Sequence, residues 1–399
     1  MARLQEQITR KQPSCQAMHQ ALWSLGCRPF FLAAAVWAAC AIPLWMVAFT
    51  TGVALPSHFA PMGWHIQAML FGFVPAAVAG FLLTAVANWT QRSPICGRRL
   101  QALFALWLAG RLACFISAHL PLSLVAIVDV VFPLALCAVV SREVIAARNW
   151  RNIAMGLPVF VLGLANLLSY GELAGLVVPP GLSFRLGFMA IIVLISVIGG
   201  RIIPAFTRNW LAQQGRRVEV NTPGSLDRLA LGALHLGLVG WVFAPWAKAV
   251  GLLLLAAAVL NAWRLARWHG LTTLAEPLLA ILHLGYAWVA LGAALLGASI
   301  LHPVIPMPAA IHALSAGAMG TMIMAVMTRV LRGHTGRPLQ ADRITATIYL
   351  MVTIAAVLRV LAAFMGAMAL FELSAFFWAL GFGGFVLAYG PMALLPRQG

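Results

Sequence analysis

The chain has 399 residues, of which 62% are hydrophobic and only 9% are charged. An average soluble domain carries about 25% charged residues, so this chain lacks the polar groups that a water-facing surface needs. A soluble globular protein is therefore excluded. The sequence predicts an all-α, polytopic integral membrane protein that lies mostly in lipid.

The basic residues are spread along the chain in small groups between apolar runs. Lys and Arg total 26 against 9 Asp and Glu, which gives a formal net charge of +17. Such an excess raises the question of nucleic acid, because basic faces bind phosphates. Short basic blocks between apolar spans are typical of membrane topology signals instead. We therefore expect the protein to contact membrane lipid and to bind no nucleic acid.

The apolar runs predict a bundle of about twelve transmembrane helices. A helix needs about 20 mostly apolar residues to cross a bilayer, and twelve runs of that size are bounded by Pro, Gly or charge. The predicted spans are 30–51, 63–88, 100–118, 121–140, 153–176, 183–206, 226–243, 247–266, 272–298, 308–330, 344–364 and 368–394. Residues 1–29 are predicted to form an N-terminal tail, 30–394 a single membrane domain, and 395–399 a short C-terminus.

The loops between these spans alternate in charge. The first tail and every second loop hold nearly all of the arginines, while the opposite loops hold little beyond Lys248 and Arg185. By the positive-inside rule the arginine-rich loops are cytoplasmic. An even number of spans then places both termini in the cytoplasm.

Two predicted hairpins place opposite charges at equal depth in the membrane. Arg111 and Asp129 lie equally far from the turn between the third and fourth spans, and Arg359 lies opposite Glu372 across the last turn. Ionisable groups at membrane depth usually face the bundle interior beside a partner. One interpretation is that both pairs are buried ion pairs that hold their hairpins together.

The alternative is that one or more of these arginines, with Arg185, binds the propionates of a buried haem. A guanidinium group matches a carboxylate through two parallel hydrogen bonds. The sequence alone leaves both interpretations open.

Ten histidines occur in this apolar chain. His65 lies about one turn inside the second span and His312 about one turn inside the tenth, so the two meet at equal depth if these helices are neighbours. His283 lies near mid-membrane, and His334 follows the tenth span on the cytoplasmic side. Neutral imidazole binds haem iron, copper or zinc, and it also relays protons. For each single histidine, a hydrogen-bonded interior position is the alternative.

Three cytoplasmic helix ends are rich in polar residues: 88–90, 199–210 and 327–338. We expect them to form one polar assembly, with Pro204 breaking its helix there. Helix caps and snorkelling side chains are the alternative interpretation.

At these segments the sequence resembles the NnrS family, membrane proteins of bacteria linked to nitric oxide metabolism. The resemblance covers almost the whole chain and rests on several motifs in the same order. These are LGCRPFF (25–31), WH (64–65), MLFGF (69–73), GFLLTAV (80–86), WLAGR (107–111), GRIIPAFTRNW (200–210), AVMTR (325–329) and GHTGRP (333–338), together with His283 and His312.

The resemblance implies a twelve-helix bundle in the bacterial inner membrane that binds haem b, with copper as a candidate second metal. It implies a function in nitric oxide metabolism, such as denitrification or the response to nitrosative stress. The family histidines fall on His65, His283, His312 and His334. The chain departs from the family pattern WH-x-HEM in the second span, where Gln67 and Ala68 replace the second His and the Glu. A candidate metal ligand and a candidate proton carrier are thereby lost.

The leading hypothesis is a haem-binding protein that binds, senses or reduces nitric oxide or a related small nitrogen oxide. His65 and His312 are the expected ligands, with His283 deeper in the same cavity; the sequence indicates no electron donor. The alternatives are a twelve-span secondary transporter without haem, with discontinuous helices at Gly199 and Pro204, and a scaffold without a ligand.

Overall fold

The computed structural model describes residues 15–216, 220 and 224–398. Within these residues every regular element is a helix. Eleven segments are long and apolar enough to cross a membrane. The chain is therefore an all-α, multi-pass membrane protein, as its composition predicts.

The helices follow the predicted spans closely, and two of the spans contain a π-helical segment. After a short helix, α2 (Cys15–Leu22), the elements in chain order are α3 (Cys27–Thr51), α4 (Pro61–Ala68), η1 (π, Met69–Phe73), α5 (Val74–Thr90), α6 (Gly97–Phe115), α7 (Leu122–Ala146), α8 (Gly156–Leu173), α9 (Leu182–Gln213), α10 (Ser225–Phe243), α11 (Lys248–Ala266), α12 (Pro277–Leu301), α13 (Met307–His312), η5 (π, Ala313–Gly320), α14 (Thr321–His334), α15 (Arg343–Met365) and α16 (Met368–Leu394). Short 3-10 turns lie between some of them.

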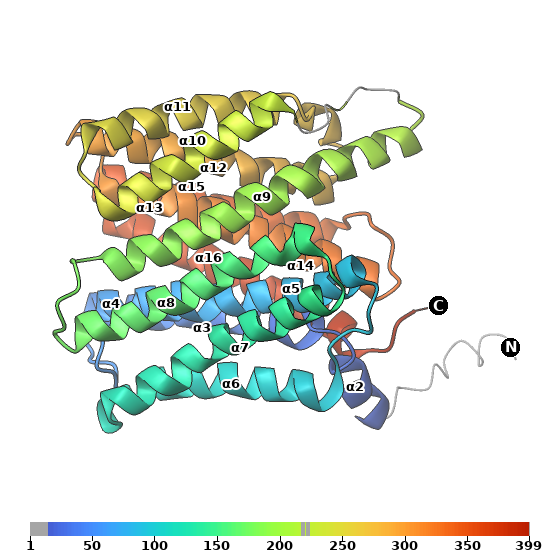
Figure 1. Ribbon diagram of the computed structural model, residues 1–399, viewed down its shortest axis with the longest axis horizontal. Helices are drawn as coiled ribbons and strands as arrows, with labels where there is room; N and C mark the ends of the chain where they lie inside the picture. Colours follow the sequence, from blue (N-terminus) through green and yellow to red (C-terminus); the bar gives the residue numbers. More distant parts are fainter. Residues whose placement is uncertain (1–14, 217–219, 221–223, 399) are drawn as a thin grey trace, which may run out of the picture.

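Helix α6 corresponds to the third predicted span, which is not among the eleven apolar segments. Its 19 residues include Arg98, Arg99 and Arg111, and these charges lower its apolar character. It nevertheless packs along α7 as an antiparallel hairpin (Figure 1). Two of its arginines stand in its first turn, and the third is buried. Together with the eleven apolar segments, α6 therefore completes the twelve predicted spans.

The long helices lie side by side along one direction, and α9 runs obliquely between α8 and the α10–α12 group (Figure 1). The last helix, α16, packs against both α15 and α3, so the end of the chain lies beside its first span. We call the end of the bundle that holds the loops at 91–96 and 335–342 the arginine-rich end. Helices α4 and α13 begin at the opposite end.

The span formed by α4, η1 and α5 is the most enclosed of the eleven. In its most apolar stretch 83% of the residues are buried, whereas the corresponding value for α16 is 28%. A helix in the centre of the bundle touches other helices, and not lipid, on every side. Polar side chains on α4 therefore face the interior of the bundle, and both polar centres described below include this helix.

Pro204 does not break its helix, which corrects the expectation from the sequence. Helix α9 continues from Leu182 to Gln213 with Pro204 inside it. Proline removes one hydrogen bond, to the carbonyl of Gly200, but packing on both sides of a membrane helix tolerates this loss. Gly200 is held closely, because a Cβ atom there would lie 1.9 Å from Nη2 of Arg264. The departures from α-helical geometry occur instead at η1 and η5.

Candidate functional site

A cavity lies in the half of the bundle away from the arginine-rich end, and we call it the histidine cavity. The space open to the centre of a water-sized sphere is about 190 Å³. Apolar and aromatic side chains form most of its wall. Its lining consists of Ile42, Trp45, Met46, Met62, His65, Ile66, Met69, Leu70, Phe73, Val74, Phe184, Phe188, Ile311, His312, Ser315, Ala316, Met319, Arg359, Phe371, Ser374, Ala375 and Trp378.

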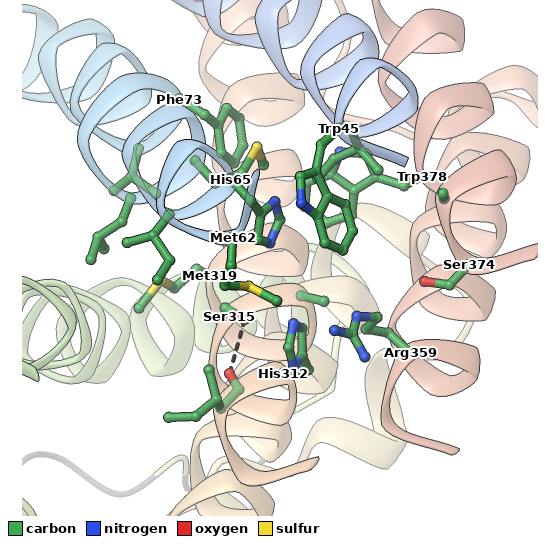
Figure 2. A pocket seen from close by; sticks show the side chains of 18 of the residues that line it. Trp45, Met62, His65, Phe73, His312, Ser315, Met319, Arg359, Ser374 and Trp378 are labelled. Carbon is green, nitrogen blue, oxygen red and sulfur yellow. Dashed lines mark hydrogen bonds between the residues drawn. The ribbon is translucent and has the colours of Figure 1, made fainter. Parts of the chain in front are cut away.

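His65 and His312 both line this cavity, as their equal depth in the sequence predicts. Figure 2 shows the two imidazole rings and the Arg359 guanidinium directed into one space, from α4, α13 and α15 respectively. Nδ1 of His312 lies 2.7 Å from the carbonyl oxygen of Pro308. Because a carbonyl only accepts hydrogen bonds, Nδ1 carries the proton. The neutral ring then keeps a free lone pair on Nε2, the atom that binds metals.

The ring of His65 is held by an aromatic stack. It lies 4.3 Å from the ring of Trp45 with an angle of 25° between the planes. Its Nδ1 atom is buried and finds no hydrogen-bond partner among the residues that the structure describes. A buried polar atom left unpaired costs free energy unless a ligand or water pairs with it. His65 is therefore oriented by packing, and its Nδ1 is left without a hydrogen-bond partner among the described residues.

A π-helical segment follows each of these two histidines. His65 lies one turn before η1, and His312 directly precedes η5. Glycines let neighbouring helices approach there: a Cβ atom on Gly317 would lie 2.5 Å from the Trp288 ring. π-Helical segments within α-helices frequently occur at functional sites, so these two irregular spans mark the histidine cavity.

Arg359 does not pair with Glu372, which corrects one of the two predicted ion pairs. Its guanidinium carbon lies 4.4 Å above the ring of Phe371, and its Nη1 atom is buried without a partner among the described residues. Glu372 is exposed instead. One residue along an α-helix turns the side chain by about 100°. Phe371 thus faces the cavity and Glu372 faces away from it.

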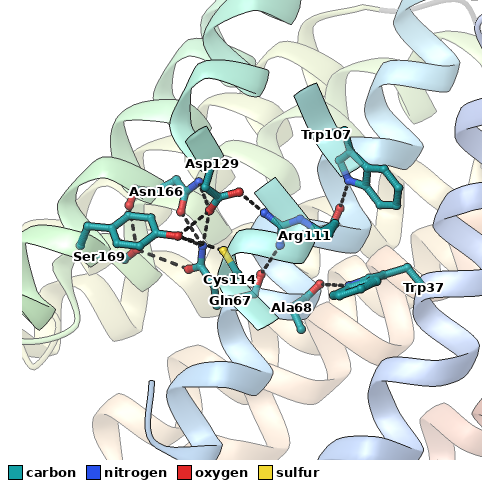
Figure 3. A network of polar contacts seen from close by, with 11 residues as sticks. Trp37, Gln67, Ala68, Trp107, Arg111, Cys114, Asp129, Asn166 and Ser169 are labelled. Atoms are coloured by element: carbon teal, nitrogen blue, oxygen red, sulfur yellow. Dashed lines mark hydrogen bonds and ion pairs between the residues drawn. The ribbon is translucent and has the colours of Figure 1, made fainter. Parts of the chain in front are cut away.

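Arg111 and Asp129 do form the predicted buried ion pair between α6 and α7. The Asp129 carboxylate also accepts hydrogen bonds from Gln67 Nε2 at 2.6 Å, Asn166 Nδ2 at 2.9 Å and the Tyr170 hydroxyl at 2.9 Å. We call these five residues the Asp129 network (Figure 3). Arg111 does not line the histidine cavity. Of the two interpretations of Arg111, the geometry favours the structural ion pair over the haem contact.

The two residues at which the second span departs from the family-like pattern, Gln67 and Ala68, both make contacts inside the bundle. Gln67 is 2% exposed and binds Asp129 rather than the cavity. The carbonyl oxygen of its neighbour Ala68 accepts a hydrogen bond from Trp37 Nε1 at 2.8 Å. Asn166 and Tyr170 were not singled out from the sequence, although two polar residues four apart in an apolar span are a recognisable signal.

His283 does not lie in the histidine cavity, contrary to expectation. It is 7% exposed, and its Nε2 atom lies 2.9 Å from the Thr207 hydroxyl oxygen on α9. Its other ring nitrogen, Nδ1, is buried and unpaired among the described residues. Arg185 also lies outside the cavity lining, where it donates to the carbonyl oxygens of Val242 and Pro180 at 3.2 and 3.0 Å.

His334 lies at the arginine-rich end, where the three polar helix ends meet as predicted. There it lines a second cavity, the Arg201 cavity, with about 320 Å³ open to the centre of a water-sized sphere. The cavity is lined by Phe81, Thr84, Ala85, Asn88, Trp89, Met155, Ile198, Arg201, Ile202, Phe206, Val330 and His334. The guanidinium carbon of Arg329 lies 4.0 Å above the Phe206 ring. The four family-matched histidines thus occupy three separate places.

The donor set of the histidine cavity limits which metal centre it fits. No three His, Cys, Asp or Glu side chains come close enough to share a metal ion within the described part of the chain. The cavity offers two imidazoles and the thioethers of Met46, Met62, Met69 and Met319. These methionines were missed in the sequence, although Met62 and Met69 lie three and four residues from His65 on one helix face. Haem brings four nitrogens of its own and takes its remaining ligands from protein, so two imidazoles would be enough donors for a haem.

The model of a family described as NnrS protein matches residues 21–397, nearly the whole chain. A search of curated proteins finds no match.

Proposed function

Because the chain belongs to the NnrS family, we propose that it is a haem-binding protein of the bacterial inner membrane that binds nitric oxide or a related small nitrogen oxide. The observation that carries the proposal is the histidine cavity, in which two imidazoles and an unpaired guanidinium face one apolar space. A bound haem b would supply the iron that takes nitric oxide as a ligand.

His312 is the better placed of the two residues that would hold the iron. The Pro308 carbonyl fixes its tautomer and orientation, so Nε2 is presented to the cavity without rearrangement. His65, held by its stack on Trp45, is the second candidate ligand. The aromatic wall of Phe73, Phe188 and Trp378 is suited to a flat apolar macrocycle.

Arg359 would bind a propionate of the haem. An unpaired guanidinium in an apolar cavity requires a negative charge, and within the described residues no acidic side chain lines this cavity. A propionate supplies that charge and matches the planar fork of the guanidinium. Copper remains a candidate second metal, since imidazole and thioether ligands suit Cu(I). The four family-matched histidines lie in three separate places, so they would not bind one copper ion together.

The same absence of acidic lining favours binding or sensing over reduction of nitric oxide. Reduction of two nitric oxide molecules to nitrous oxide and water consumes two electrons and two protons. Proton paths in membranes run through Asp, Glu or His side chains, and of these the cavity lining holds only the two imidazoles proposed as iron ligands. The Asp129 carboxylate is occupied by its own donors and does not line the cavity. We therefore place the protein in nitric oxide binding or in the response to nitrosative stress.

An optical spectrum of detergent-purified protein, made with haem available, tests the proposal. We expect a Soret band and a reduced-minus-oxidised difference typical of haem b. His312→Ala is expected to abolish or shift that band, whereas His302→Ala is a matched control because His302 is exposed outside the cavity. A wild-type protein without a Soret band would refute the haem assignment, and metal analysis of the same sample would then test copper. An unchanged band in His312→Ala would refute the ligand assignment.

The arginine-rich end is proposed to face the cytoplasm, with both termini on that side. The support is the charge asymmetry of the loops. Labelling of single cysteines introduced at either end, from one side of an intact membrane, would test this orientation.

A further inference from the structure

A third, smaller space lies between the two cavities. This middle hollow has about 70 Å³ open to the centre of a water-sized sphere. It is lined by Phe31, Val74, Ala77, Val78, Phe81, Ile191, Leu194, Ile195, Ile198, Gly199, Ile202, Met322, Ile323, Val326 and Met327. It shares Val74 with the histidine cavity, and it shares Phe81, Ile198 and Ile202 with the Arg201 cavity. The three spaces are therefore adjacent and follow one another along the bundle.

Three spans, namely α9 and the second and tenth predicted spans, line this series of three cavities along its whole length. Helix α9 contributes residues three or four apart, which lie on one face of a helix: Phe184, Phe188, Ile191, Ile195, Ile198, Ile202 and Phe206. At 1.5 Å per residue this stripe is about 33 Å long, close to the thickness of a hydrocarbon core. The second and tenth spans contribute comparable stripes, and the stripe of the tenth runs from His312 to His334.

The polarity of the series changes sharply between its ends and its middle. One end holds His65, His312 and Arg359, and the other holds Arg201 and His334. Every side chain of the middle hollow is apolar. An ion or a proton-carrying chain of water would lose its hydrogen bonds there at a cost of several kcal/mol, whereas a small neutral molecule would not. Dry apolar cavities bind apolar atoms and molecules such as xenon and benzene.

We propose that the middle hollow is a passage through which a small neutral molecule, of the size of a diatomic gas, moves between the histidine cavity and the arginine-rich end. The passage admits such molecules and excludes ions and protons. The identity of the molecule as nitric oxide rests on the proposed function, but the passage itself rests on the shared lining residues of the three spaces.

Xenon provides a test that does not depend on haem. In crystals of the protein pressurised with xenon, we expect a xenon atom among Ala77, Ile195 and Val326. Ile198 is half-buried and lines two of the three spaces, so Ile198→Trp is designed to fill the passage. Val197→Trp is the matched control, because Val197 is also half-buried on α9 but lines none of the three spaces. If Ile198→Trp does not fold, Val326→Trp, which is half-buried on α14, takes its place.

The passage also predicts a change in ligand kinetics. After flash photolysis of the carbon monoxide complex of the reduced protein, Ile198→Trp is expected to slow bimolecular rebinding by about tenfold, equivalent to about 1.4 kcal/mol of added barrier. Its haem spectrum is expected to match the wild type, and Val197→Trp is expected to rebind at the wild-type rate.

The outcomes separate the passage from the proposed function. A middle hollow without xenon, or equal rebinding rates in all three proteins, would overturn the passage even when the haem band is present. A protein without a haem band, but with xenon that Ile198→Trp displaces and Val197→Trp does not, would support the apolar space and refute the proposed function.

Discussion

His65 and Gln67 stand two residues apart on α4, yet they belong to two polar centres of opposite character. Gln67 belongs to the Asp129 network, in which one carboxylate accepts hydrogen bonds from four side chains. His65 belongs to the histidine cavity, in which its own Nδ1 and the Nη1 of Arg359 are unpaired among the described residues. The same buried helix thus contributes to a centre whose carboxylate is fully paired, although Nε of Arg111 there has no partner among the described residues, and to a second centre that holds no counter-charge for its cation.

The comparison shows how to separate structural from ligand-binding polar residues inside a membrane bundle. Satisfied buried networks rigidify a fold and specify its packing. Groups left unpaired cost stability and are retained where a ligand completes them. We therefore expect substitutions in the Asp129 network to change stability, and substitutions in the histidine cavity to change ligand binding.

The largest expected effect is that of Asp129→Ala. This change leaves the buried Arg111 without its counter-charge, and breaking a buried pair in this way costs about 3–5 kcal/mol. Thermal unfolding of the detergent-purified protein would measure it as a large fall in the midpoint. Glu372→Ala is the control, because Glu372 is exposed. Equal midpoints for the two variants would contradict a stabilising role of the network.

A smaller loss of stability is expected for Gln67→Leu. Leu is similar in size to Gln but cannot donate to Asp129, and a hydrogen bond to a charged group contributes about 1.5–3 kcal/mol. The same unfolding measurement would show an intermediate fall, with exposed Gln213→Leu on α9 as control. The Soret band should persist, since Gln67 does not line the cavity. Loss of the band in a folded protein would place Gln67 in the ligand site.

The smallest effect on stability is expected for Arg359→Leu. Without haem, the change removes an unpaired cation together with a cation–π contact of about 0.5–1 kcal/mol. The free energy of unfolding should therefore change by less than the energy of that contact, and the unfolding midpoint should shift only slightly. Haem retention during dilution should fall, while Arg359→Lys retains the charge and should bind haem with intermediate strength. A fall in stability as large as that of Asp129→Ala would show that Arg359 is part of a structural pair.

The two predicted hairpin pairs show where sequence reasoning succeeds and where it stops. Counting residues from a turn gives the depth of a side chain in the membrane, and it paired Arg111 with Asp129 correctly. It gives no direction around the helix axis, so it failed for Arg359, whose neighbour across the hairpin is Phe371 and not Glu372. The same limit applied to His283, whose depth alone did not reveal that it faces Thr207.

The sequence by itself determined the helical membrane fold, the limits of the spans to within seven residues, the family, and the equal depth of His65 and His312. These follow from local properties, since apolar length and charge decide what crosses a bilayer. Only the tertiary structure decided which helix faces meet: that two of the four family-matched histidines share a cavity, that Gln67 turns toward Asp129, and that three adjacent cavities share lining residues. Those facts depend on the rotation and packing of helices distant in the chain, which residue spacing within one helix does not encode.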